Sequence, residues 1–294
     1  MKPPPFEYFN PTSIDEALLH LSEHGYDAKA LAGGQSLIPM MNFRLAQPAV
    51  LVDLNSIPEL SYIRPDDQGG LRLGAMARHH QVEHDPLVAE RAPLIAEAMP
   101  QIATTQIRSR GTFGGSIAHA DPSAELVAIS VALDGRFRMR SQSAEREANA
   151  ADFFLGMFTT QLEPQELLVE IILPAFPPRT GWALMEVAQR PHDFALVGVA
   201  AVVSLDDREH IHRAQIVLFS VGDGPVVAQK AAEVLRNQRP APDLIRAAAE
   251  TAGIEDVDPS SDIHASSAYR RHLVKVLTRQ ALEKALERAK VSAH

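Results

Sequence analysis

The spacing of hydrophobic residues over the first part of the chain predicts a small α/β unit. Apolar runs at 6–9, 28–31 and 49–54 have the length of strands, and the third is apolar almost throughout, as in strands buried on both faces. Between the first two runs, Ser13 and Glu16 form a capping-box pattern ahead of a helical stripe of leucines. The expected order is therefore strand, helix, strand, loop, strand.

The middle of the chain predicts further helices and strands. A turn cluster at 65–70 separates two short apolar runs, which is typical of a hairpin. Pro122 follows Asp121 and is expected to begin a helix, because proline is favoured in the first helical turn. The expected helices cover 86–99, 122–133 and 151–154, and the expected strands cover 61–64, 71–73, 136–140 and 167–173.

A proline-rich segment at 174–178 is the clearest linker candidate, and the pattern changes beyond it. Three long apolar runs joined by turns predict antiparallel strands, and helices follow them. The strands are expected at 182–190, 194–205 and 211–221, and the helices at 226–236, 244–251 and 267–290. The whole pattern predicts an α+β protein.

Composition narrows the classes of function. The 294 residues carry a formal net charge of −9, which disfavours nucleic acid as a partner. Cysteine is absent, which removes disulfides, thiolate zinc sites, iron–sulfur ligation and a cysteine nucleophile. The start, Met1 to Pro5, lacks the apolar core of a signal peptide, and the longest apolar run, 194–203, is too short to span a bilayer. We therefore expect a soluble, cytoplasmic protein without a transmembrane segment.

Two glycine-rich motifs carry the strongest functional signal. The first motif, residues 32–36 (Ala-Gly-Gly-Gln-Ser), follows an expected strand, and the second motif, residues 111–116 (Gly-Thr-Phe-Gly-Gly-Ser), precedes an expected helix. Glycine lets a backbone approach a ligand closely, and successive N–H groups in such a loop form a nest for phosphate. Each motif alone could equally be a tight turn, but two of them suggest a ligand with a long phosphate-bearing spine.

Other catalytic patterns are weak or missing. His80, Glu83 and His84 match the H-x-x-E-H zinc pattern. However, Asp85-Pro86 would break the helix beside the second histidine, so a solvated polar segment is favoured. The sequence holds neither the G-x-S-x-G motif of serine hydrolases, nor a P-loop, nor a strand followed by G-x-G-x-x-G.

The polar residues around the second motif have two interpretations each. Asp121 and Glu125 could accept hydrogen bonds from the hydroxyls of a ribose or ribityl chain, or Asp121 could simply cap the helix. Arg108 and Arg110 could face phosphates, although pairing with acids at the surface or at a subunit interface is favoured.

With these residues in view, the sequence resembles a known family. The two motifs, together with 106–108 and 119–122, resemble the FAD-binding medium subunits of the molybdenum hydroxylases, which include carbon monoxide, quinoline and nicotine dehydrogenases and a domain of xanthine dehydrogenase. Further matches lie at 163–168, 193–200 and 266–270, so the resemblance covers nearly the whole chain in order.

The resemblance implies a fold and a set of cofactor contacts. Residues 1–56 and 57–176 would be the two subdomains of a PCMH-type FAD-binding domain, and 177–294 a smaller C-terminal α+β domain with a three-stranded antiparallel sheet and helices. Segment 190–194, by default a structural turn, could touch the flavin ring. Neither a catalytic residue nor a metal ligand is implied. The implied FAD contacts are Lys29, Ala30, Leu31, Ala32, Gly33, Gly34, Gln35, Ser36, Leu37, Gly111, Thr112, Phe113, Gly114, Gly115, Ser116, Ala118, Asp121, Glu125 and Leu168.

The sequence departs from the family pattern at three positions. The usual second motif reads Thr-Ile-Gly-Gly-Asn, whereas Phe113 and Ser116 stand here in place of the isoleucine and asparagine. Serine keeps a donor but is shorter, so a contact at Ser116 is expected to be water-mediated. Gln35 stands where some members have histidine.

The family implies an electron-transfer subunit of a heterotrimeric enzyme, assembled as a dimer of heterotrimers. An iron–sulfur small subunit and a molybdopterin large subunit would oxidise the substrate, an N-heterocycle or carbon monoxide, and FAD on this chain would pass electrons to an external acceptor. Two alternatives stay open. One is a stand-alone flavin oxidoreductase, and the other is a flavin-free adaptor subunit of the same fold, supported only by the departures at Phe113 and Ser116.

Overall fold

A parallel three-stranded sheet forms the N-terminal part of the protein, whose computed structural model describes residues 2–291. Its strands are β1 (Glu7–Phe9), β2 (Ala28–Leu31) and β3 (Val50–Asp53), in the order β1-β3-β2. The central strand β3 is largely buried, as its apolar sequence predicts. Helix α1 (Ile14–His24) begins at the predicted cap, where the Ser13 hydroxyl accepts a hydrogen bond from Glu16 N at 3.2 Å.

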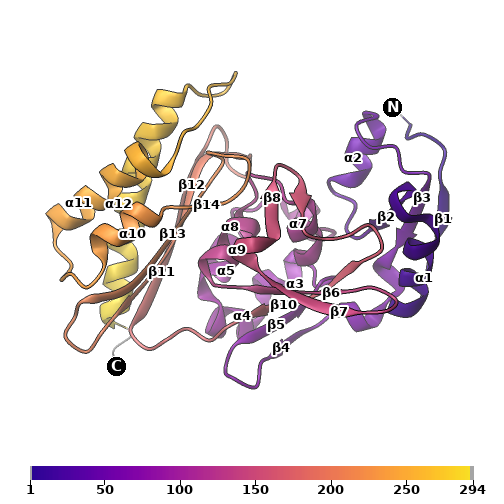
Figure 1. Cartoon of the computed structure of the whole chain (residues 1–294), viewed down its shortest axis with the longest axis horizontal. Coiled ribbons are helices and arrows are strands. Elements are labelled where there is room, and N and C mark those ends of the chain that lie inside the picture. Colours follow the sequence, from indigo (N-terminus) through magenta and orange to yellow (C-terminus); the bar gives the residue numbers. More distant parts are fainter. Residues whose placement is uncertain (1, 292–294) are drawn as a thin grey trace.

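A five-stranded antiparallel sheet forms the middle of the protein, and helices cover one of its faces (Figure 1). Its strands, in the order β4-β5-β10-β6-β7, are β4 (Ile63–Pro65), β5 (Leu71–Gly74), β10 (Leu167–Leu173), β6 (Arg136–Arg140) and β7 (Glu145–Asn149). The helices are α3 (His79–His84), α4 (Pro86–Arg91), α5 (Pro93–Ala98), α6 (Thr105–Arg108), α7 (Phe113–His119), α8 (Glu125–Ala132) and α9 (Ala150–Phe153), and a separate hairpin joins β8 (Phe154–Gly156) to β9 (Thr159–Thr160).

Two of the helices predicted for this middle part differ in the structure. The helix expected at 86–99 is broken at Ala92 into α4 and α5, because Pro93 cannot donate the hydrogen bond that would continue α4. The helix expected from Pro122 begins only at Glu125. The Asp121 carboxylate accepts a hydrogen bond from Ser123 N at 2.8 Å and closes a turn ahead of the helix instead of capping it.

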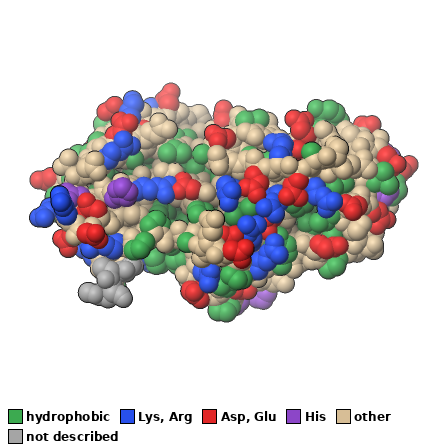
Figure 2. Space-filling model, turned by 60° about the horizontal axis from the view of Figure 1, so that its bottom comes forward, with side chains coloured by type: hydrophobic (Ala, Val, Ile, Leu, Met, Phe, Trp, Pro, Cys, Tyr) green, Lys and Arg blue, Asp and Glu red, His purple; other side chains and the backbone are tan. Residues whose placement is uncertain are grey.

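On the face of the middle sheet opposite the helices, charged side chains surround one buried carboxylate. Glu170 on β10 is only 2% exposed. Its Oε1 accepts hydrogen bonds from Tyr62 Oη at 2.7 Å and Arg64 Nη2 at 2.9 Å. Its Oε2 accepts from Arg72 Nη1 at 2.9 Å and lies 3.1 Å from Arg138 Nη1. Acidic and basic side chains are interspersed across the face of the molecule in Figure 2, so opposite charges lie close to one another there.

A four-stranded antiparallel sheet forms the C-terminal part, and both of its faces are covered. Along β12, Val199 and Ala201 pack among the C-terminal helices, whereas Ala200 and Val202 belong to the core of the middle part. This double burial explains the nearly continuous apolar run in the sequence. The elements are β11 (Thr180–Ala188), β12 (Ala195–Leu205), β13 (Ile211–Phe219), β14 (Val226–Val227), α10 (Gln229–Leu235), α11 (Pro242–Thr251) and α12 (Ser267–Val291).

The three expected C-terminal strands are confirmed, and β14 was missed. Its two residues were assigned to a helix that in fact begins at Gln229, because so short a strand leaves no period in the sequence. Among residues 2–291, no helix has both the length and the apolar character needed to cross a membrane. The expected segments 1–56 and 177–294 include residue 1 and residues 292–294, which lie outside the described part.

Candidate functional site

The two glycine motifs, far apart in the sequence, lie in direct contact. A Cβ atom at Gly33 would lie 2.3 Å from the carbonyl oxygen of Arg110 and 2.8 Å from Gly111 Cα. A Cβ atom at Gly115 would lie 3.6 Å from the Cβ of Ala32. The first motif follows β2 of the N-terminal sheet, and the second belongs to the middle part, so the site is built where these two parts meet.

The first motif is a loop of free hydrogen-bond donors. It joins β2 to a short helix, α2 (Leu37–Asn42), and Gly34 adopts a left-handed φ of 72° that favours glycine. The hydrogen bonds within residues 2–291 leave the backbone N–H groups of Gly33, Gly34, Gln35 and Ser36 unused. Successive unpaired N–H groups form an anion-binding nest, so this loop fits a phosphate or pyrophosphate.

The second motif is the first turn of helix α7 and not the loop that its glycines suggested. Thr112 caps the helix, and its Oγ1 accepts a hydrogen bond from Gly115 N at 3.1 Å. Phe113 N and Gly114 N donate to Ala77 O and Ala75 O, both at 2.9 Å. Its small residues allow close approach, but most of its backbone donors are already used. The first motif therefore offers free hydrogen-bond donors, whereas the second mainly allows close approach of a ligand.

The remaining residues expected to contact a cofactor differ in exposure. The expected residues of β2, Lys29 and Ala30, are exposed, and Ser116 and Ala118 of α7 are partly exposed. Several others are buried: Phe113 (0% exposed) and Leu168 (5%) belong to the middle core, and Thr112 is 2% exposed. The departure at Phe113 therefore concerns packing of the core.

A buried acid, Glu125, lies at the start of α8 within the electrostatic influence of a half-buried acid, Glu186. Burial raises the pKa of the Glu125 carboxyl to about 8, and the negative charges of Glu186 and Asp121 add to the rise. Burial likewise raises the pKa of Glu186, on β11, to about 7. Asp121 and Glu125 were predicted from the sequence, but Glu186 was not, because it reaches this place only through the packing of the C-terminal sheet on the middle part.

Glu125 is expected to make the stability of the chain fall as the pH rises. Its carboxyl has an ordinary pKa of 4.5 in the unfolded chain, so between pH 4.5 and 8 the folded state holds a proton that the unfolded state has lost. The free energy of unfolding should fall across this window, on the order of 1 kcal/mol per pH unit. Glu125→Gln should flatten that slope and raise stability at pH 8.

The measurement is thermal unfolding of the chain from pH 5 to pH 8.5. Glu283→Gln is the matched control, since Glu283 is exposed on α12. Equal slopes for Glu125→Gln and the unmodified chain would show that the Glu125 carboxyl is ionised in the folded state.

Arg108 pairs with an acid, as the favoured interpretation held, although in a buried position and not at the surface. Its guanidinium donates to both carboxylate oxygens of Glu83, at 2.8 and 3.2 Å, and to the carbonyls of Ile102 and Ala103. Glu83 is the acid of the H-x-x-E-H pattern, so a cation already holds its carboxylate. This pairing supports the structural interpretation of that pattern.

Two side chains outside both motifs connect them, and neither was predicted from the sequence. Asn55 Nδ2 donates to Ala32 O at 3.0 Å, and the guanidinium of Arg78 donates to Asn55 Oδ1 and to Arg110 O. Neither residue belongs to a recognisable motif, so no local signal could have found them. We call this pair the Asn55–Arg78 strut.

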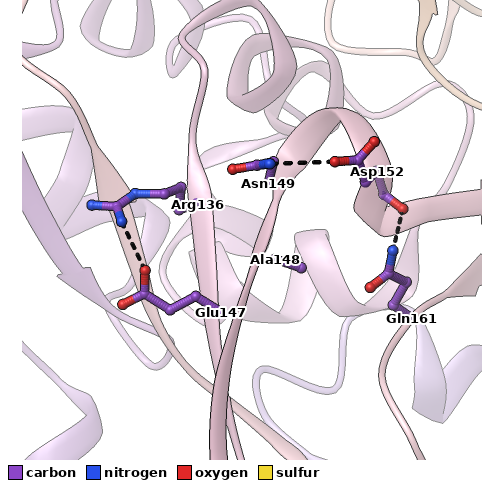
Figure 3. Close-up of a pocket in the computed structure, with 6 residues that line it drawn as sticks. All are labelled: Arg136, Glu147, Ala148, Asn149, Asp152 and Gln161. Atoms are coloured by element: carbon purple, nitrogen blue, oxygen red, sulfur yellow. Dashed lines mark hydrogen bonds and ion pairs between the residues drawn. The ribbon is translucent and has the colours of Figure 1, made fainter.

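A polar hollow of about 390 Å³ lies elsewhere, on β6, β7 and α9 (Figure 3). Its side chains are already paired with one another: Arg136 with Glu147 at 2.9 Å, and Asn149 Nδ2 with Asp152 Oδ2 at 3.3 Å. Because these polar side chains already have partners, the hollow does not offer a reactive set of groups.

Comparisons with known proteins identify the family over nearly the whole chain. A family model described as "FAD binding domain in molybdopterin dehydrogenase" matches residues 4–176, and one described as "CO dehydrogenase flavoprotein C-terminal domain" matches residues 182–285. The chain belongs to the FAD-binding medium subunits of the molybdenum hydroxylases. It is therefore an oxidoreductase subunit with FAD as its cofactor.

Relatives of this medium subunit come from several dehydrogenases. It is 38% identical over 290 residues to the 6-hydroxypseudooxynicotine dehydrogenase complex subunit alpha of Paenarthrobacter nicotinovorans, covering 99% of this chain and 97% of that one. Its structure matches carbon monoxide dehydrogenase from Hydrogenophaga pseudoflava with a TM-score of 0.94 and 38% identity, over 98% and 99% of the two chains. It matches quinoline 2-oxidoreductase from Pseudomonas putida 86 with a TM-score of 0.92 and 35% identity, over 100% of both chains.

Proposed function

We propose that this medium subunit is the electron-exit module of a heterotrimeric molybdenum hydroxylase, with the FAD pyrophosphate in contact with both glycine motifs. The observation that carries the proposal is the set of unused N–H groups at Gly33, Gly34, Gln35 and Ser36, held against the first turn of α7. These donors match a dianionic linker, which they can bind without Lys or Arg. The remaining residues implied by the family resemblance complete the proposed site.

The proposed partners are an iron–sulfur small subunit and a molybdopterin large subunit, in a dimer of heterotrimers. The absence of cysteine supports this division of labour, because thiolates are the usual ligands of iron–sulfur clusters. The names of the relatives, as subunits or medium chains of dehydrogenases for nicotine derivatives, caffeine and carbon monoxide, also support it. We propose an N-heterocycle or carbon monoxide as the substrate of the complex, oxidised in another subunit.

The proposed task of this chain is to bind and orient the cofactor. FAD supplies the exchange of electrons when it is bound. The first motif would hold the pyrophosphate, and the first turn of α7 would bring small residues close to it. We propose that residues 1–56 and 57–176 are the two subdomains that enclose FAD and that 177–294 form a separate C-terminal domain. No acid–base pair is required of the chain for this task.

Reconstitution with flavin tests the proposal. The chain, expressed with its partner subunits and stripped of flavin, is expected to take up FAD stoichiometrically and show a flavin spectrum. FMN lacks the pyrophosphate, so its affinity should be lower by about a hundredfold, as the loss of charged hydrogen bonds predicts. The measurement is the flavin content after gel filtration, with each cofactor in turn.

The alternatives give different results in the same experiment. A complex that contains no FAD after gel filtration would identify a flavin-free adaptor. Substrate oxidation by this chain alone, free of iron and molybdenum, would identify a stand-alone flavoenzyme.

A further inference from the structure

The Asn55–Arg78 strut joins two backbone carbonyls, one at each glycine motif. Asn55 lies in the turn after β3, on the N-terminal side of the site, and Arg78 lies just before α3, on the middle side. The amide of Asn55 binds Ala32 O at 3.0 Å, and the Arg78 guanidinium reaches both Asn55 Oδ1 and Arg110 O. The strut therefore crosses the boundary between the two parts of the protein.

Each end of the strut is anchored in its own part. On the N-terminal side, Asp53 accepts a hydrogen bond from Asn55 N at 2.9 Å and another from Tyr8 Oη at 2.5 Å. These bonds fix the backbone that carries the Asn55 amide. The amide can therefore move only together with the end of β3.

The backbone of Arg78 is held equally firmly against the second motif. Arg78 pairs with Thr112 as an isolated β-bridge, and His79 N donates to Gly111 O at 3.0 Å. Phe113 N in turn donates to Ala77 O at 2.9 Å. A shift of Arg78 would therefore move the start of α7.

The strut also determines where one donor of the first motif points. In a planar trans peptide the C=O and N–H groups point in opposite directions. Since Ala32 O is directed at Asn55, the N–H of Gly33 in the same peptide unit points away from it. That N–H is one of the unused donors of the nest.

We propose that Asn55 and Arg78 are positioning residues of the flavin site. They hold the two motifs in contact, so that one pyrophosphate can lie against both, and they orient the Gly33 N–H toward it. Their effect passes through the backbone carbonyls of Ala32 and Arg110. This inference rests on the proposed function. Arginine is required because its planar fork reaches two acceptors at once, whereas lysine is a single point charge.

The test measures FAD affinity of the flavin-stripped complex that contains the full chain. Asn55→Ala and Arg78→Lys should each weaken binding by about tenfold or more, the loss expected for hydrogen bonds that involve a charged group. Because both substitutions break the same strut, the double variant should bind about as weakly as either single variant. The circular dichroism of bound flavin should also change, since the cofactor would sit against displaced motifs.

The matched controls are Asn149→Ala and Arg136→Lys, which remove comparable polar contacts at the hollow in Figure 3. They should leave FAD affinity unchanged. Full FAD affinity in Arg78→Lys would contradict the proposed role of the strut and show that only the positive charge matters. Strictly multiplicative losses in the double variant would also overturn it. If the unmodified complex binds no FAD, the proposed function itself fails. Normal FAD binding by every variant would contradict only the proposed role of the strut.

Discussion

Replacing Gly33 by alanine is expected to abolish retention of FAD. The new Cβ would lie 2.3 Å from Arg110 O and 2.8 Å from Gly111 Cα, closer than such atoms can approach. One neighbour is the backbone of Arg110, just before the second motif, and the other is Gly111 within it. The second motif is tied to Ala77 and Ala75 by hydrogen bonds. The first motif must therefore move away, and its free N–H groups with it.

We expect FAD affinity to fall by about a hundredfold or more, because small displacements of aligned donors have large effects on binding and catalysis. The measurement is the flavin content of the purified complex, followed by titration with FAD. Gly224→Ala is the matched control, since a Cβ there would have nothing within 4 Å. Normal flavin content in Gly33→Ala would contradict the proposed role of the contact between the motifs.

Gly114 is a less informative position for the same experiment. A Cβ at Gly114 would lie 2.5 Å from the Cβ of Ala75, inside the core of the middle part. A larger side chain would therefore disturb folding before it affected any ligand. The motif glycines serve packing between backbone segments as well as access for a phosphate.

Replacing Glu170 by alanine is expected to lower the free energy of unfolding by about 3–5 kcal/mol. The carboxylate is 2% exposed and accepts hydrogen bonds from Tyr62, Arg64 and Arg72. Its removal would leave several cations close together, with no anion between them. Glu145→Ala is the control, because Glu145 is half exposed and its contact with Arg138 spans 3.3 Å, so a loss below about 1 kcal/mol is expected.

Denaturant unfolding of the two variants measures the difference. Burial by itself would raise the pKa of Glu170, but the hydrogen bonds from Tyr62 and Arg64 and the charges of Arg138 and Arg72 hold it below its ordinary value. Its stabilisation should therefore persist at neutral pH and be lost as the pH falls below about 4.5, the usual pKa range of glutamate. Equal unfolding midpoints for Glu170→Ala and Glu145→Ala would contradict the central role of this carboxylate.

Much of the fold could be predicted because local patterns determine it. The Ser13 cap, the hairpin around 65–70 and the long C-terminal strands follow from capping, turn residues and apolar runs. Two of the predicted helices were wrong because a nearby residue interrupts or delays the helix that the hydrophobic pattern suggests. Pro93 divides a helix that looks continuous, and the turn closed by Asp121 delays α8 to Glu125.

The sequence by itself determined the local elements, the two glycine motifs and the family resemblance, since these depend on neighbouring residues and their order. Only the tertiary structure decided that Gly33 touches Arg110, that Glu186 joins Glu125, and that Asn55 and Arg78 connect the motifs. Such contacts join residues from different parts of the protein. Their distances depend on how those parts pack, and the periodicity of a single segment carries no record of that packing.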